Sequence, residues 1–169
     1  YEIVSRDWSS DVCSSDLIAL AGIVCDQSIR IAGDEFTADI MEALRRYHSL
    51  LIGERTAEQI KIHVGAALKD LDTPPDDMAV NGRDLVTGIP KQIMVSYQEV
   101  AEALDKSIFK IEEAILKALE TTPPELAADI YRRGLYLTGG GALLRGLDKR
   151  LSQKIKLPVQ DRKSTRLNS

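Results

Sequence analysis

One stretch near the carboxyl end, residues 135–155, constrains the fold of this chain more than any other. It consists of a short apolar run at 135–138, three consecutive glycines at 139–141, and leucines at helical spacing over 142–155. An apolar run, a tight turn and an amphipathic segment in this order predict a strand followed at once by a helix. Alternation of strands and helices is typical of a parallel sheet backed by helices, so the sequence predicts an α/β fold.

The preceding segments add helices and short strands. Residues 23–31 alternate apolar and polar side chains after a turn at Ala21-Gly22, which predicts one strand of a hairpin. Asp34 can cap a helix that extends to about residue 48. A second helix is expected to start at a capping box formed by Thr56 and Gln59.

The pattern in the middle of the chain predicts a small inserted subdomain. Residues 70–77, with two prolines, end the second helix, and residues 78–96 are rich in β-branched and apolar side chains. Asn81-Gly82 and Gly88 interrupt this stretch and predict tight turns between short strands. We therefore expect a small α+β subdomain here.

Three further signals mark helix ends in the second half. Ser96 and Glu99 form a capping box before the longest amphipathic pattern of the chain, over 97–120. Residues 122–125, Thr-Pro-Pro-Glu, form another box with proline at the first helical position. Gly134 follows two arginines and is placed for a helix C-cap.

The two ends differ from the middle in composition. Residues 1–16 contain five serines and four acids without a period of 2 or 3.6. This segment and residues 161–169 resemble translated sequencing-adaptor sequence, although an ordinary polar tail would look similar. We treat both as non-native and exclude them from the fold prediction.

Charge and cysteine content exclude several classes of protein. The 169 residues carry 22 basic and 26 acidic side chains, a net charge of −4 without a basic run, which argues against nucleic acid as a partner. The longest apolar stretch, 17–25, is far shorter than the ~20 residues that span a bilayer, which favours a cytoplasmic protein. Cys13 and Cys25 lack the spacing of a metal site. His48 and His63 have no catalytic partner at useful spacing, so we assign them no role and predict no catalytic or metal-binding residue.

Two features could bind a ligand. The glycines at 139–141 bring bare backbone amides and a helix start to the edge of a sheet, where a phosphate or nucleoside can approach. The pattern is neither the Walker sequence nor G-x-G-x-x-G, and glycines needed only for packing explain it equally well. Glu58 and Lys61 lie on one helical face, where both could bond a ribose hydroxyl, although a solvated ion pair is the simpler interpretation.

Five stretches together resemble one family, the MreB proteins, bacterial actin homologues that determine rod shape. These stretches are IRIAGDEFTADI, LLIGERTAEQIKIHVGAA, NGRDLVTGIPK, TTPPELAADIYRRG and LYLTGGGALLRGLDKRL. The resemblance covers residues 17–160, and GERTAEQIK and TPPELAADI are its most specific parts. Ala32 departs from the pattern, since the family usually has a glycine before Gly33-Asp34.

The resemblance implies half of an actin-like (RNase H-like) ATPase domain, with a mixed sheet flanked by helices. Residues 17–50 and 98–160 would form the larger subdomain of the second domain, and residues 51–97 its small inserted subdomain. By similarity, the adenine and ribose contacts would come from two short segments. They are Glu58, Gln59, Ile60 and Lys61 in the first, and Gly140, Gly141, Ala142 and Leu143 in the second.

The resemblance also implies a function. The complete protein would bind ATP with Mg²⁺, hydrolyse it slowly, and polymerise on the inner face of the cytoplasmic membrane to guide the cell-wall elongation machinery. The second phosphate loop, D-x-G-G-G-T in the family, should stand where the adaptor-like residues 1–16 are. We therefore expect this chain to be inactive as an ATPase, with the first strand of its hairpin missing and an open sheet edge. A sugar kinase or Hsp70-like chaperone of the same superfamily is the alternative, and a free-standing interaction module is disfavoured.

Overall fold

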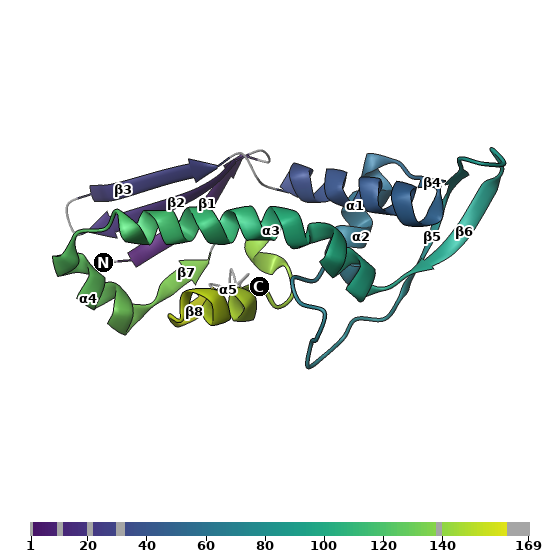
Figure 1. The fold of residues 1–169 in the computed structure, drawn as a ribbon. Helices are drawn as coiled ribbons and strands as arrows, with labels where there is room; N and C mark the ends of the chain where they lie inside the picture. The colour runs from purple at the N-terminus through teal and green to yellow at the C-terminus, as the bar shows by residue number, and fades with distance from the viewer. Residues whose placement is uncertain (1, 10–11, 20–21, 30–32, 138–139, 162–169) are drawn as a thin grey trace, which may run out of the picture.

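The computed structural model describes residues 2–9, 12–19, 22–29, 33–137 and 140–161. Figure 1 shows an elongated molecule in which two sheets lie toward opposite ends and a long helix runs between them. The elements are β1 Glu2–Ser9, β2 Val12–Ala19, β3 Gly22–Ile29, α1 Gly33–His48, β4 Leu50–Leu51, α2 Glu54–Val64, β5 Met78–Asp84, β6 Pro90–Val95, α3 Tyr97–Glu120, α4 Pro124–Arg133, β7 Leu135–Leu137, the 3-10 turn η1 Gly140–Leu143, α5 Leu147–Ile155 and β8 Val159–Asp161.

The larger sheet has five strands in the order β3-β2-β1-β7-β8. The β1–β2 and β2–β3 pairs are antiparallel, whereas β7 pairs in parallel with both β1 and β8. The predicted hairpin, the mixed sheet and the strand at Leu135–Leu137 are confirmed. The expectation that the first strand of the hairpin is missing was wrong, because β2 pairs antiparallel with β3 and β1 adds a further strand beside β2. The adaptor-like origin of residues 1–16 stays a prediction, and the tail beyond Asp161 lies outside the described residues.

The smaller sheet has the order β4-β5-β6 and is antiparallel throughout. The turn predicted at Gly88 is confirmed, since the chain reverses between Asp84 and Pro90. The turn predicted at Asn81-Gly82 was wrong, because both residues lie within β5. A Cβ at Gly82 would stand 2.7 Å from the Leu51 carbonyl oxygen and from Leu50 Cγ, so the glycine allows close approach of β4 rather than a reversal.

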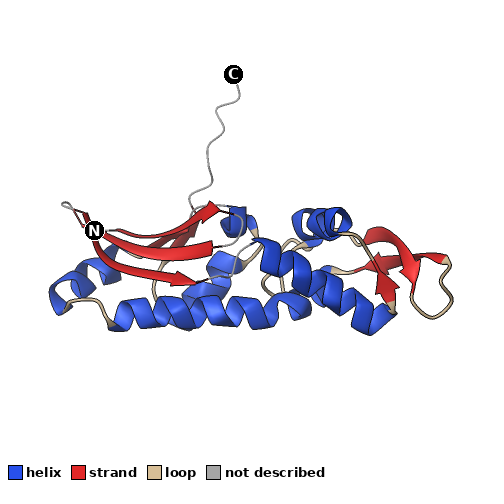
Figure 2. Cartoon of the chain, turned by 90° about the horizontal axis from the view of Figure 1, so that it is seen from above, coloured by secondary structure: helices blue, strands red, loops and turns tan. Residues whose placement is uncertain are grey.

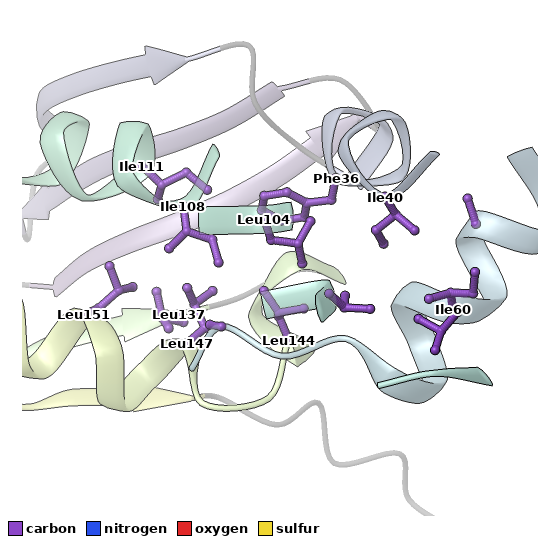
Figure 3. Packing of buried hydrophobic residues seen from close by; sticks show 14 of the residues in the cluster. Phe36, Ile40, Ile60, Leu104, Ile108, Ile111, Leu137, Leu144, Leu147 and Leu151 are labelled. Atoms are coloured by element: carbon purple, nitrogen blue, oxygen red, sulfur yellow. The ribbon is translucent and has the colours of Figure 1, made fainter. Parts of the chain in front are cut away.

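Helix α3 connects the two ends of the molecule and supplies much of the core, as predicted (Figure 2). It packs against α1, α2, α5 and the strands β2 and β3. Leu104 and Ile108 on this helix are fully buried among leucines and isoleucines from α1, β7 and α5 (Figure 3). A polar contact adds to this packing, because the buried Ser107 hydroxyl bonds Asp39 of α1 at 2.5 Å.

Helix ends agree with the sequence at some points and differ at others. Ser96 is the N-cap of α3 and accepts a bond from the Glu99 amide at 3.4 Å, and Gly134 is the C-cap of α4. The Glu99 carboxylate does not complete the capping box, because it contacts the His48 ring at 3.2 Å instead. The box predicted at Thr56 was wrong, since α2 starts at Glu54 after an N-cap glycine.

Two other predicted helix starts also need correction. Proline does stand at the first position of α4, but Thr122 caps nothing there and donates to the Ala118 carbonyl oxygen of α3 at 2.9 Å. The final helix was expected from Ala142, whereas α5 starts only at Leu147. The backbone of Arg145 pairs with Ala66 in an isolated parallel bridge, which is incompatible with a continuous helix through this point.

Within the described part of the chain, none of the helices combines the length and the apolar character needed to cross a membrane.

Candidate nucleotide-binding site

The first group of predicted site residues lies on α2 and is fixed to the start of α1. The Lys61 ammonium donates to the Glu58 carboxylate at 2.6 Å, to the Gly33 carbonyl oxygen at 2.9 Å and to the Thr37 hydroxyl at 3.2 Å. Thr37 Oγ1 also lies 2.9 Å from both the Glu58 carboxylate and the Gly33 carbonyl oxygen. These bonds close a small polar network between the two helices.

Burial distinguishes this network from a solvated surface pair. The Lys61 side chain is only 15% exposed and Thr37 is buried, whereas the Glu58 carboxylate keeps 46% of its surface in solvent. Burial raises the pKa of Glu58, but the hydrogen bonds from Lys61 and Thr37 outweigh it, so the pKa of this carboxyl lies below its ordinary value. The result is a charged carboxylate with a fixed position and free acceptor capacity.

The other two residues of this group differ from each other. Gln59 is exposed, while Ile60 is fully buried in the core, so the Ile60 side chain offers nothing to a ligand. Sequence reasoning did not single out Gly33 and Thr37, although both stand within the family stretch IRIAGDEFTADI. Only the packing of α1 on α2 reveals their role, because they are far from Glu58 in the sequence.

The second group lies at the carboxyl end of β7. Gly140, Gly141, Ala142 and Leu143 form the 3-10 turn η1, and Thr138 and Gly139 lie outside the described residues. The Leu143 side chain is 71% exposed although it is apolar, while Leu144 beside it is buried. A large aliphatic side chain held outside the core at a sheet edge is suited to contact a flat, apolar ligand group.

A surface pocket adjoins this turn. Its volume is about 350 Å³, within the range of small-molecule sites. It is lined by residues 71–73 of the loop after α2, residues 142–146, Asp148 and Lys149. The exposed Lys149 and Asp72 form an ion pair across its rim.

The two groups are linked indirectly, through hydrogen bonds between residues that flank them. Just beyond α2, the Ala67 amide donates to the Arg145 carbonyl oxygen at 2.8 Å, and Arg145 Nη1 donates to the His63 carbonyl oxygen at 2.7 Å. The segment after the glycine turn is therefore attached to the end of the helix that carries Glu58 and Lys61. The predicted residues come from parts of the sequence about 80 positions apart, and these bonds link their neighbours rather than the predicted residues themselves.

Comparison with known proteins decides the family. The sequence model of the MreB/Mbl protein family matches residues 9–166, nearly the whole chain. The chain belongs to the MreB/Mbl family. Over 143 residues, this MreB/Mbl chain is 47% identical to the cell shape-determining protein Mbl of Bacillus subtilis, covering 85% of the chain and 42% of that protein. It is 44% identical over 146 residues to the cell shape-determining protein MreB of Escherichia coli, covering 85% of the chain and 41% of that protein.

Solved structures agree with this assignment. MreB5 of Spiroplasma citri bound to ADP superposes with a TM-score of 0.89 at 34% identity, over 95% of this MreB/Mbl chain and 48% of the other chain. The MamK double helical filament shares the fold, with a TM-score of 0.74 at 22% identity. The predicted α/β, actin-like fold class is confirmed. The chain spans about two-fifths of the length of the curated relatives described above.

Proposed function

We propose that this chain contributes the adenine and ribose side of the nucleotide site in an ATP-binding, filament-forming cell-shape protein. The observation that carries the proposal is the fixed, half-exposed Glu58 carboxylate, held by Lys61 and Thr37 on a helix whose carboxyl end is hydrogen-bonded to Arg145, after the glycine turn. Two of the structural relatives, both MreB5 of Spiroplasma citri, were solved with ADP and with AMPPNP bound. Filament formation, rod-shape maintenance, contact with the cell-wall elongation machinery and attachment to the cytoplasmic membrane are proposed from the family.

The chemistry of the two segments suits a nucleoside. A ribose presents vicinal hydroxyl groups, and an ionised carboxylate accepts hydrogen bonds only, so Glu58 can accept from them. Bonds to a charged acceptor are stronger than neutral ones. The backbone of the glycine turn and the exposed Leu143 side chain would contact the base.

The sequence between β1 and β2 concerns the phosphate side of the site. Parallel pairing of β1 with β7 brings the end of β1 to the same sheet edge as the glycine turn. The chain at the β1–β2 connection is Ser9-Ser10-Asp11-Val12, and the first glycine of the sequence is Gly22. A glycine-rich phosphate loop is therefore absent from this position, and we assign no Mg²⁺ ligand and no step of hydrolysis to the chain.

A titration of the ¹⁵N-labelled 169-residue chain with adenosine, ADP and ATP tests this proposal. We expect amide shifts at Glu58–Lys61 and at Gly140–Leu143 with all three ligands. ATP should bind less than about tenfold tighter than adenosine, because the phosphates gain little here. Glu58→Ala should weaken ADP binding by about 1.5 kcal/mol, the lower end for a bond to a charged group, because the carboxylate is half exposed.

Glu54→Ala is the matched control, since Glu54 is exposed one turn earlier on the same helix. It should leave the affinity unchanged. If the wild-type chain shows no shifts with any of the three ligands, the nucleotide proposal is wrong. Equal affinity for ADP in Glu58→Ala and wild type would mean that the Glu58–Lys61 ion pair stabilises the fold and does not contact the nucleotide.

The cell-shape part of the proposal needs a cellular assay. Residues 17–160 can replace the matched segment of Mbl in Bacillus subtilis, and cell shape can be scored by microscopy. We expect the chimera to support normal shape and the same chimera with Glu58→Ala to support it poorly. A chimera that is produced at normal level but never supports normal shape would contradict the assignment.

The alternative, a sugar kinase or Hsp70-like protein, has no comparable observation in its favour.

A further inference from the structure

Arg150 on α5 lies at the centre of a polar cluster that the proposed site does not include. Its guanidinium donates from Nε to Glu112 at 2.6 Å, from Nη2 to Asp105 at 2.7 Å and from Nη1 to the Ala67 carbonyl oxygen at 3.0 Å. The Arg150 side chain is 17% exposed and the Glu112 side chain 4%. One planar group therefore connects three separate segments of the fold.

The three acceptors have different mechanical roles. Glu112 and Asp105 belong to α3, so two of the bonds fix the guanidinium on the long helix that spans the molecule. The third bond holds the backbone at Ala67, three residues after the end of α2. Burial lowers the pKa of Arg150, but the bonds to Glu112 and Asp105 outweigh it and raise that pKa, so the group stays charged.

The held backbone is part of the connection between the two halves of the proposed site. Ala67 donates its amide to Arg145, and Arg145 donates its side chain to His63 of α2. Arg150 thus bonds the carbonyl of the same residue whose amide bonds the segment after the glycine turn. Without this third bond, the hydrogen bonds described between the end of α2 and that segment would be those made by Arg145.

We propose that Arg150 is a positioning residue for nucleotide binding, which sets α2 and its Glu58–Lys61 pair at the correct separation from Gly140–Leu143. This inference rests on the proposed nucleotide function. Arg150 itself lies on α5, outside both segments, and acts through the Ala67 carbonyl. Lysine cannot replace it, because a single ammonium does not reproduce a planar fork that meets three acceptors in fixed directions.

The test uses the 169-residue chain, with ADP as the probe and an amide spectrum that reports whether each variant is folded. Arg150→Lys should weaken ADP binding about fivefold to tenfold, the loss expected for about one hydrogen bond of ordinary strength. It should also speed amide hydrogen exchange in the last turn of α2. Arg145→Ala removes an exposed side chain, so folding is not at stake, and it should weaken ADP binding in the same direction.

Lys154→Ala is the control, because Lys154 is exposed one turn after Arg150 on the same helix and its described contact is with the Phe109 ring, away from both segments. Its ADP affinity should equal that of wild type. A merely structural Arg150 would lower stability and leave the affinity of the folded chain unchanged. Affinity within twofold of wild type for folded Arg150→Lys and for Arg145→Ala would overturn the inference. Absence of ADP binding by the wild-type chain would overturn the proposed function, and the inference with it.

Discussion

Replacement of Gly134 by alanine should destabilise the chain more than any surface substitution. Gly134 has φ 77° and ψ −165°, a region that only glycine adopts readily, and this conformation costs another residue about 1–3 kcal/mol. A Cβ would stand 2.1 Å from the Pro158 carbonyl oxygen, a backbone atom that cannot move alone. That oxygen accepts the Leu135 amide at 2.9 Å, so displacement of Pro158 also loses a bond worth about 1 kcal/mol.

The sum is about 2–4 kcal/mol, a large part of the roughly 5–15 kcal/mol that stabilises a domain. Urea unfolding followed by circular dichroism measures this loss. Gly53→Ala is the control, because Gly53 has φ −83° and nothing within 4 Å of an added Cβ, and it should cost about 1 kcal/mol or less. Equal losses for the two variants would refute the conformational argument.

Three further predictions concern packing, capping and acid stability. Leu104→Ala should lower the free energy of unfolding by about 2–5 kcal/mol, because Leu104 is fully buried, whereas Glu113→Ala on the exposed face of the same helix should change it little in the same urea assay. Ser96→Ala should lower the thermal midpoint through loss of a cap worth about 1 kcal/mol, and Thr56→Ala should do so less, since Thr56 is not a cap. The pKa of Glu58 is lower in the folded chain than in the unfolded chain, where it is about 4.3. The stability that Glu58 contributes is therefore complete above the unfolded-state pKa and is lost as the pH falls through the folded-state pKa. Glu58→Gln should therefore show a smaller loss of stability between about pH 5 and pH 3 than wild type, and an identical acid profile would contradict the observed network.

Local signals predicted most helices and several strands correctly. The amphipathic pattern over 97–120, the Ser96 cap and the Gly134 C-cap depend on neighbours in the sequence, and all three are present in the structure. The turn predicted at Asn81-Gly82 was wrong because that glycine is needed for a contact between distant parts of the chain. The glycine there accommodates β4, a strand about 30 residues away, and no local pattern reports such a contact.

In the candidate site, too, the sequence predicted some features, and others are visible only in the packed structure. Family stretches identified both segments that carry the proposed contacts, but periodicity alone could not separate a ribose contact from an ion pair at Glu58. The partners that fix this carboxylate, Thr37 and Gly33, come from another helix and became visible only through packing. Arg150 gave no sequence signal, because its acceptors lie on α3 and in the loop after α2, both distant in the sequence.

The length of α3 has a mechanical consequence. Its 24 residues span about 36 Å at 1.5 Å per residue, and it packs against strands of the larger sheet as well as against α1 and α2 beside the smaller one. A stiff rod of this length is a lever, in which a tilt of about 5° displaces one end by about 3 Å relative to the other. A displacement of that size at one end of α3 would therefore move the elements packed on its other end without any local unfolding.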